Sequence, residues 1–195
     1  MEIKDKIILA SGSPRRREIL KQAGLSFDVV PSDAEETVNE TEPAKIVEQL
    51  SLRKAIEVAD RQSEDCIVIG ADTVVALDQQ ILGKPGTEEN ACQMIRLIQG
   101  RSHAVYTGVT LLHKIDGQVQ AHTFHEKTEV EVVSMTEQEI RDYVAKGESL
   151  DKAGAYGIQG AFAAYIRGIK GDYYNVVGFP LCHFMQALKT IFSIE

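Results

Sequence analysis

The first candidate for ligand chemistry is a turn of small residues that leads into three arginines. An apolar run at residues 7–10 is followed by the segment SGSPRRR at residues 11–17. A strand that feeds a helix through such a turn leaves free backbone N–H groups at the positive helix end, where a phosphate can bind. We therefore expect Ser11, Ser13 and at least one arginine to contact an anion. A helix places consecutive arginines on different faces, so not all three can serve one ligand. An ordinary solvated helix start is the alternative.

The second candidate is a carboxylate, Asp72, which comes directly after the apolar run at residues 66–70. We expect it at the carboxyl end of a strand, where open α/β sheets bind their ligands. Burying this carboxylate would be costly unless a metal, a lysine or hydrogen bonds compensate. The sequence therefore predicts a functional Asp72, and the alternative is a turn residue that caps its own backbone.

Two lysines and an acidic pair complete the charged candidates. Lys84 lies in the segment GKPG, and Lys54 lies on the helix predicted at residues 43–60. Each could meet a phosphate as a point charge, although a lone lysine is more often a solvated side chain. Glu35 and Glu36 could hold Mg²⁺ against a polyphosphate, because Mg²⁺ usually takes one or two carboxylates plus phosphate oxygens.

The last candidate is the glycine-rich segment DKAGAYGIQG at residues 151–160. Its three glycines and two alanines permit a close approach of the backbone to a ligand. Asp151, Lys152 and Gln159 are the polar side chains that could line such a site. A flexible connector between two elements is the alternative interpretation.

The elements that must position these residues alternate between strand and helix early in the chain and form hairpins later. Ser13 is expected to cap the first helix, with Pro14 at its first position. The helix at residues 43–60 would bury one apolar face (Ile46, Val47, Leu50, Ile56 and Ala59). Residues 73–77 either continue the strand at 66–70 or pair with residues 81–82 across the turn at 78–80. The patterns predict strands at 7–10, 27–30, 66–70, 106–113, 119–123 and 128–133, and helices at 14–23, 43–60, 87–99, 136–146 and 180–192. This arrangement favours an α/β fold with a mixed sheet.

Composition excludes several classes of protein. The chain has 195 residues, a size typical of one domain spanning residues 1–195. A net charge of −8, only 6% aromatic residues and no tryptophan argue against nucleic acid as a partner. A phosphate substrate would require local cations or a metal, because the overall field repels anions.

The sequence also predicts a cytoplasmic protein. The first six residues run into a strand without an apolar signal region, and no run of about 18 apolar residues could cross a membrane. The three cysteines form no C-x-x-C pair and are expected as small buried residues in a reducing compartment. The sequence has neither a G-x-x-x-x-G-K-[ST] phosphate loop nor a G-x-S-x-G serine nucleophile.

Four segments together resemble the signature blocks of the Maf family of nucleotide pyrophosphatases. They are LASGSPRR at 9–16, GADTVV at 70–75, LGKP at 82–85 and DKAGAYGIQG at 151–160, in the order that the family shows. The ending AYGIQG resembles the branch that acts on dTTP and UTP, not the branch that acts on methylated guanosine triphosphate.

This resemblance implies a hydrolase that cleaves dTTP and UTP, or modified pyrimidine nucleotides, to the monophosphate and pyrophosphate. It implies an elongated α/β fold with a mixed twisted sheet, flanking helices and a cleft between two lobes, similar to inosine triphosphate pyrophosphatases. It also implies a cytoplasmic homodimer that needs Mg²⁺ or Mn²⁺. Its cellular role would be house-cleaning, with a link to inhibition of septum formation.

The resemblance also implies roles for individual residues. Asp72 would be the proton acceptor, and Asp72 and Glu36 would hold the metal. Arg15, Thr73 and Gln159 match positions tied to substrate choice. The implied substrate-binding residues are Ser11, Ser13, Arg15, Lys54, Thr73, Lys84 and Gln159.

Two other functions remain open on the sequence. The segment at residues 9–16 is also similar to the opening loop of sugar nucleotidyltransferases, which would transfer a nucleotide to an acceptor. A nucleotide-sensing protein that binds a division or repair partner would bind tightly without turnover.

Overall fold

The computed structural model describes residues 5–78 and 80–192, which form one mixed sheet of seven strands. Six strands lie in the order β2-β1-β3-β5-β6-β7, and β4 pairs with β3 beside this path. β1 runs parallel to β2 and β3, whereas the remaining pairs are antiparallel. The strands are β1 (Lys6–Leu9), β2 (Asp28–Val29), β3 (Cys66–Leu77), β4 (Gln80–Leu82), β5 (Ser102–Ile115), β6 (Gln118–Val132) and β7 (Ile166–Lys170). The predicted mixed α/β sheet is confirmed.

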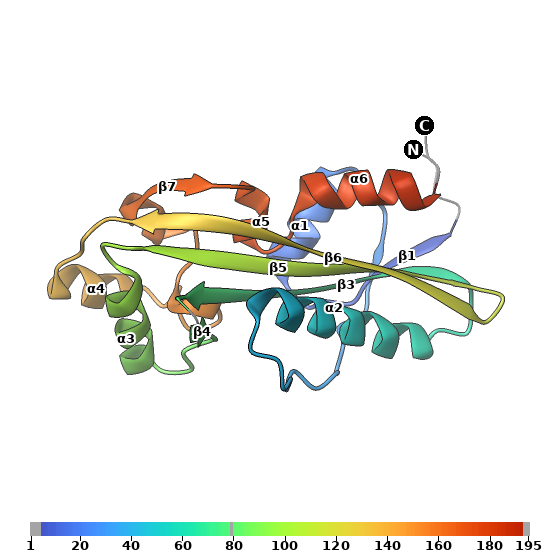
Figure 1. The fold of residues 1–195 in the computed structure, drawn as a ribbon, viewed down its shortest axis with the longest axis horizontal. Helices are drawn as coiled ribbons and strands as arrows, with labels where there is room; N and C mark the ends of the chain where they lie inside the picture. Colours follow the sequence, from blue (N-terminus) through green and yellow to red (C-terminus); the bar gives the residue numbers. More distant parts are fainter. Residues whose placement is uncertain (1–4, 79, 193–195) are drawn as a thin grey trace.

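Helices cover both faces of this sheet. They are α1 (Pro14–Gln22), α2 (Pro43–Asp60), α3 (Glu88–Ile98), α4 (Glu137–Val144), α5 (Tyr173–Val177) and α6 (Leu181–Phe192), with short 3-10 turns η1 (Ala153–Ala155) and η2 (Ala161–Tyr165). α2 covers one face, and α1 and α6 cover the other (Figure 1). β1 reflects this layering, because Leu9 packs with α1 and α6 while Ile8 packs with α2.

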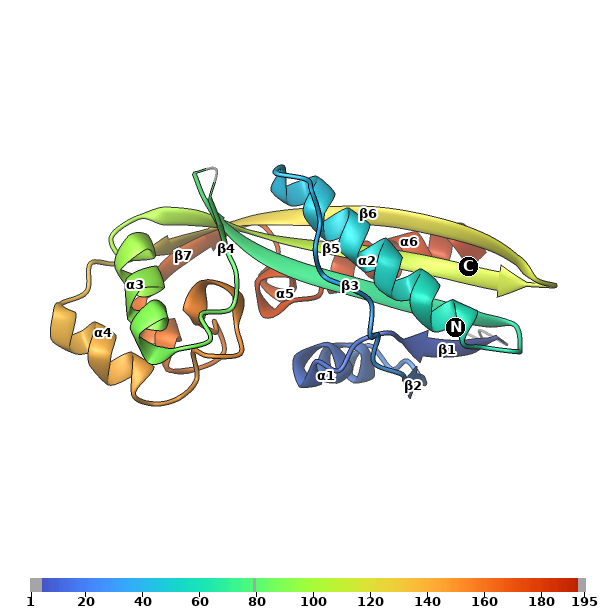
Figure 2. The same ribbon diagram turned by 90° about the horizontal axis from the view of Figure 1, so that it is seen from below.

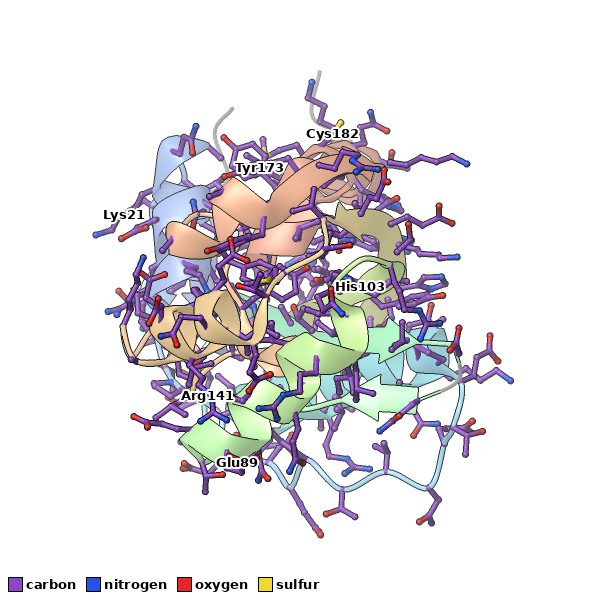
Figure 3. All side chains as sticks on the ribbon, turned by 90° about the vertical axis from the view of Figure 1, so that its left-hand side faces the viewer. Lys21, Glu89, His103, Arg141, Tyr173 and Cys182 are labelled. Atoms are coloured by element: carbon purple, nitrogen blue, oxygen red, sulfur yellow. The ribbon has the colours of Figure 1, made fainter. Side chains whose placement is uncertain are left out.

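Three long strands, β3, β5 and β6, extend through both halves of the molecule (Figures 1 and 2). In the first half they pack against α1, α2 and α6. In the second half they pack against α3, α4 and the loop that follows α4. Arg96 of α3 bridges Glu89 and Glu137 at that end, where Figure 3 labels Glu89 and Arg141. The two cores therefore share one continuous sheet.

Helix α2 lies unusually close to the sheet because two glycines face it. A Cβ atom at Gly70 of β3 would overlap the carbonyl oxygen of Ser51, and one at Gly108 of β5 would overlap that of Val47. The Ser51 hydroxyl also hydrogen-bonds the Thr110 hydroxyl at 3.0 Å. A glycine in a strand is the residue that permits such an approach. Because of this close approach, the part of α2 that follows Ser51 also lies against β3.

Most of the predicted elements are present, and some have longer bounds. β3 continues through residues 73–77 and also pairs with β4, so both interpretations of that segment are correct. Residue 79 of the intervening turn and residues 1–4 of the predicted N-terminal run lie outside the described residues. Thr136 and Glu139 form a capping box, and Thr87 caps α3, as expected. β7 and α5 were not predicted.

Four details of the sequence-based interpretation are wrong, and one of them is the expected burial of Cys182, which is exposed. Asp72 lies in the middle of β3, not at its end, because β3 stays paired with β5 as far as Ala76. Ile56 of α2 is exposed, since it points away from the sheet. Ser13 occupies the N-cap position of α1, but its side chain makes no capping hydrogen bond. Among the described residues, no helix combines the length and apolar character needed to cross a membrane.

Candidate active site

A cavity of about 1190 Å³ lies where α1, α2 and β3 face the loop at residues 148–160. All of the site residues expected from the sequence line it, although they come from six separate stretches of the chain. They are Ser11, Ser13, Arg15, Glu36, Lys54, Asp72, Thr73, Lys84 and Gln159. The fold therefore gathers the predicted residues in one place.

Lys54 forms the centre of the charged part of this cavity. Its Nζ donates to Oδ1 of Asp72 and to Oε1 of Glu36, each at 2.6 Å. The Lys54 and Asp72 side chains are only 11% and 13% exposed, whereas Glu36 is 59% exposed. The hydrogen bond from Lys54 lowers the pKa of Glu36. Partial burial of the carboxylate opposes this shift, and the nearby charge of Lys84 adds to it.

Asp72 lies on β3 just beyond the point where the parallel pairing of β3 with β1 ends. β1 pairs with β3 only up to Leu9 and Ile69. Beyond this point the chain turns into α1, while β3 continues and pairs Asp72 with Gly108 of β5. The edge of β3 next to Asp72 is therefore left open for a ligand. The site forms at the carboxyl end of β1, one strand away from the expected place.

Hydrogen bonds from Arg53 hold the backbone on either side of Glu36. Nη1 of Arg53 on α2 donates to the carbonyl oxygens of Glu35 and Thr37, both at 2.8 Å. These hydrogen bonds fix the loop on either side of Glu36, whose carboxylate then reaches Lys54. In the structure the carboxylate of Glu36, not that of Glu35, contacts Lys54.

Arg16 is the arginine that the structure holds most firmly, and sequence reasoning had not selected it. Its Nη1 donates to Ser11 Oγ at 2.9 Å, its Nη2 to Thr73 Oγ1 at 3.1 Å, and its Nε to the Gly178 carbonyl at 2.9 Å. Burial lowers the pKa of the Arg16 guanidinium, while the nearby Asp72 opposes this shift. The signal in the sequence was the arginine run itself, which did not reveal which member faces inward.

The Arg16 contact continues as a directed chain of hydrogen bonds. Thr73 Oγ1 lies 2.8 Å from Thr107 Oγ1, which in turn donates to the Asn175 carbonyl at 3.1 Å. Because the proton of Thr107 is used on that carbonyl, Thr73 must be the donor to Thr107. The Thr73 hydroxyl thus accepts from Arg16 and donates to Thr107, which fixes its orientation.

Arg15 is held more loosely and faces the opposite wall of the cavity. Its Nη1 lies 3.4 Å from Asp151 Oδ2, and the two side chains are 31% and 64% exposed. Lys152 pairs with the other oxygen of Asp151 at 2.6 Å. Such exposed ion pairs contribute little to stability and exchange partners easily. Arg15 is therefore available to an incoming anion.

The glycine-rich loop at residues 151–160 rests on a buried pair of side chains. The Tyr156 hydroxyl lies 2.7 Å from Nε2 of His103 on β5. Burial lowers the pKa of His103 to about 4 and raises the pKa of Tyr156, so both are neutral at pH 7. Within residues 5–78 and 80–192, Nδ1 of His103 has no hydrogen-bond partner. Gln159, by contrast, is exposed at the other end of the loop.

The cavity is balanced in charge, which bears on whether it can hold a metal. The described residues that line it include five basic and five acidic side chains: Arg15, Arg16, Lys54, Lys84, Lys152, Glu36, Glu40, Asp72, Glu148 and Asp151. No group of three or more His, Cys, Asp or Glu side chains among residues 5–78 and 80–192 could hold a metal by itself. Glu36 and Asp72 both contact the Lys54 ammonium group. These two carboxylates match the small carboxylate set that Mg²⁺ takes beside phosphate oxygens.

Comparisons with known proteins identify the family of this chain. The family model described as "Maf-like protein" matches residues 6–191. A protein named dTTP/UTP pyrophosphatase from Lachnoclostridium phytofermentans is 49% identical over 185 residues, covering 94% of each chain. Proteins of the same name from Agathobacter rectalis and Bacillus thuringiensis subsp. konkukian are 48% and 50% identical, covering 95% and 97% of this chain and 97% of each relative. With a family model that spans almost its whole length, this chain belongs to the Maf family.

Proposed function

We propose that this protein hydrolyses dTTP and UTP to the monophosphate and pyrophosphate. One observation carries the proposal: residues from all four Maf-like sequence blocks line a single cavity whose charged centre is the Glu36–Lys54–Asp72 triad. Relatives about 50% identical over nearly the whole chain bear the name dTTP/UTP pyrophosphatase. The family and the site therefore point to the same substrate.

Asp72 is the proton acceptor in this proposal. Its carboxylate is nearly buried and faces the cavity, so it can orient a water molecule and accept its proton as the water attacks the α-phosphorus. Lys54 holds the carboxylate in place through Oδ1. In the other half of the reaction, Arg15, Lys54 and Lys84 offset the charge of the departing pyrophosphate.

A divalent cation, Mg²⁺ or Mn²⁺, is part of the proposal because the cavity has no surplus of positive charge. Five basic side chains are balanced by five acidic ones, whereas the triphosphate brings about four negative charges. Glu36 and Asp72 would hold the cation. When bound, it supplies the positive charge that stabilises the triphosphate and the leaving group.

Base recognition falls to the glycine-rich loop. A carboxamide offers one donor and one acceptor, which match the N3–H and a flanking carbonyl of uracil or thymine. The exposed Gln159 can present both groups, and cytosine would leave one of them unpaired. Thr73 would influence substrate choice indirectly, because its hydroxyl is already engaged by Arg16 and Thr107.

We also propose that residues 1–195 work as one domain, since β3, β5 and β6 pass through both cores. The resemblance to the family further suggests a cytoplasmic homodimer. Sedimentation equilibrium of the purified chain measures the oligomeric state directly, and a monomer at all concentrations would refute that part.

One assay tests the activity and separates it from the alternatives. The protein is incubated with UTP and Mg²⁺ in ¹⁸O-water without an acceptor. We expect UMP that carries the label, together with unlabelled pyrophosphate. Release of inorganic phosphate with UDP would indicate a γ-phosphatase. A nucleotidyltransferase would release pyrophosphate only after an acceptor is added, and a sensor would bind UTP without turnover. Excess chelator should abolish the reaction, and added Mg²⁺ or Mn²⁺ should restore it.

A further inference from the structure

Glu148 lies in the segment after α4, and its side chain contacts the turn at the end of the glycine-rich loop. Its Oε2 accepts a hydrogen bond from the backbone N–H of Ala161 at 2.9 Å, and its carbonyl oxygen accepts one from Nζ of Lys152 at 2.6 Å. The side chain is half-buried and lies in the wall of the cavity. None of the sequence blocks that resemble the family includes this residue.

The turn that Glu148 contacts is closed by its own backbone and carries Gln159. Gly160 N–H donates to the Gly157 carbonyl at 3.2 Å, and Ala163 N–H donates to the Gly160 carbonyl at 3.0 Å. A Cβ atom at residue 160 would overlap Oε2 of Glu148 and approach its Cδ to 3.0 Å. The carboxylate therefore lies directly against the turn, and a side chain at residue 160 would displace it from this position.

Gln159 depends on this turn for its placement. The part of the chain that the structure describes offers no hydrogen bond to its carboxamide, and its side chain is exposed to the cavity. A side chain without a partner of its own is placed only as well as its backbone is. One side of the turn is held by the hydrogen bond that the Ala161 N–H donates to the Glu148 carboxylate.

We propose that Glu148 is a positioning residue that orders the turn at residues 157–161 and thereby sets the selectivity of Gln159 for uracil and thymine over cytosine. The inference rests on the proposed role of Gln159 in base recognition. Glu148 does not touch the base in this proposal; it acts through the Ala161 N–H and the backbone on which Gln159 stands.

The test compares three variants of the full chain with wild type. Glu148→Ala removes the acceptor, Glu148→Gln keeps a side-chain oxygen in the same place, and Gln159→Ala removes the proposed reader. Glu139→Ala serves as the matched control, because it breaks the α4 capping box in the same half of the molecule without touching the turn. Two quantities are measured: amide hydrogen exchange of residues 157–161, and kcat/KM for UTP relative to CTP.

We expect exchange at residues 157–161 to rise about tenfold in Glu148→Ala, because the Ala161 N–H loses its partner. The UTP-to-CTP ratio should fall towards that of Gln159→Ala, and Glu148→Gln should recover most of both effects. Glu139→Ala should change neither, even if it lowers the melting temperature as much as Glu148→Ala does.

Two outcomes overturn the inference. Unchanged exchange in Glu148→Ala would show that the carboxylate does not order the turn. A ratio retained in Glu148→Ala but lost in Gln159→Ala would show that the ordering does not matter for selectivity. If Gln159→Ala itself keeps the ratio, the proposed base recognition fails instead, and the link from Glu148 to selectivity is refuted with it, whatever the exchange data say of the turn.

Discussion

The two walls of the cavity are built on opposite principles. On the wall formed by α1, α2 and β3, each of the charged side chains Arg16, Lys54 and Asp72 already has a buried or half-buried partner within 3.1 Å. On the wall formed by the glycine-rich loop, Gln159 is exposed, and the Arg15–Asp151 pair that joins this loop to α1 is long and solvated. One wall is a hydrogen-bonded charged cluster, and the other is a loop that presents Gln159, whose carboxamide has no hydrogen-bond partner within residues 5–78 and 80–192.

This difference matches the two tasks that the reaction sets. Stabilising charge in a transition state requires dipoles and ions that are in place beforehand and need no reorganisation. Reading a base requires groups that are free to make new hydrogen bonds and lose something when the wrong base arrives. The charged wall should therefore govern turnover for every substrate, whereas the loop should govern the ratio between substrates.

The largest expected effect comes from the charged wall. Asp72→Asn keeps the size of the side chain but removes the proposed proton acceptor and one anionic partner of Lys54. We expect kcat to fall about 10²–10⁴-fold for UTP and CTP alike, within the range of general-base effects. Single-turnover kinetics at saturating Mg²⁺ measure this loss.

Asp78→Asn is the matched control, since Asp78 lies just after the end of β3 and pairs only with the exposed Arg101 among the described residues. It should leave kcat unchanged. A folded Asp72→Asn protein with wild-type turnover would remove this carboxylate from the mechanism. A change confined to the UTP-to-CTP ratio would instead place base reading on the wrong wall.

The next effect concerns Arg16. Arg16→Lys keeps the positive charge but cannot reach Ser11, Thr73 and Gly178 at once, because an ammonium lacks the planar fork of a guanidinium. Losing charge-assisted hydrogen bonds worth about 1.5–3 kcal/mol should lower kcat/KM roughly tenfold to a hundredfold. Arg17→Lys, on the next position of α1, should have little effect. Equal effects of the two substitutions would mean that the hydrogen-bond chain from Arg16 does not organise the site.

The loop should show a different kind of effect. Gln159→Ala should lower kcat/KM for dTTP and UTP more than for dCTP and CTP, because an unsatisfied group in the wrong complex costs about 1–3 kcal/mol. That corresponds to a roughly tenfold to hundredfold loss of selectivity. An equal loss of kcat/KM on all four substrates would mean that Gln159 has only a structural role. The loop would then not govern the ratio between substrates.

The sequence predicted the charged wall better than the loop, for physical reasons. Helix 43–60 was predicted with its correct bounds because Pro43 and the apolar spacing mark it clearly. The presence of Lys54 and Asp72 in one site was implied only by the resemblance, and their direct contact was not predicted. Their contact depends on how α2 packs against Gly70 and Gly108, and local spacing carries no such information.

The errors have equally specific causes. Asp72 looked like the end of a strand because Gly70 and Ala71 resemble a break, although Gly70 marks the place where α2 packs against β3. Arg16 was passed over for Arg15 because one residue along a helix turns the side chain by about 100°, and nothing local says which face is inward. The Glu148–Ala161 contact spans 13 positions of irregular chain, where no periodicity exists to predict it.

The smallest expected effect concerns pH and the support of the loop. His103 is buried and neutral, with its pKa lowered to about 4 from an ordinary 6.5. Between these two values the unfolded chain binds a proton at this histidine that the folded chain does not. The free energy of unfolding therefore decreases as pH falls from about 6.5 to about 4, and the contribution of His103 is on the order of 1–3 kcal/mol. Urea denaturation at pH 7 and pH 4.5 measures the decrease.

His103→Gln retains a neutral partner for the Tyr156 hydroxyl and cannot be protonated in this range. Its free energy of unfolding should depend on pH less steeply than that of wild type, while His122→Gln, at an exposed position of β6, should keep the wild-type slope. If the comparison of the two walls is right, acidification of wild type should raise hydrogen exchange in residues 153–160 before it does so in residues 66–76, because Tyr156, the partner of His103, belongs to the loop itself. Simultaneous loss of protection in both segments would mean that the loop and the charged wall are one cooperative unit, and that the difference between them is one of chemistry alone.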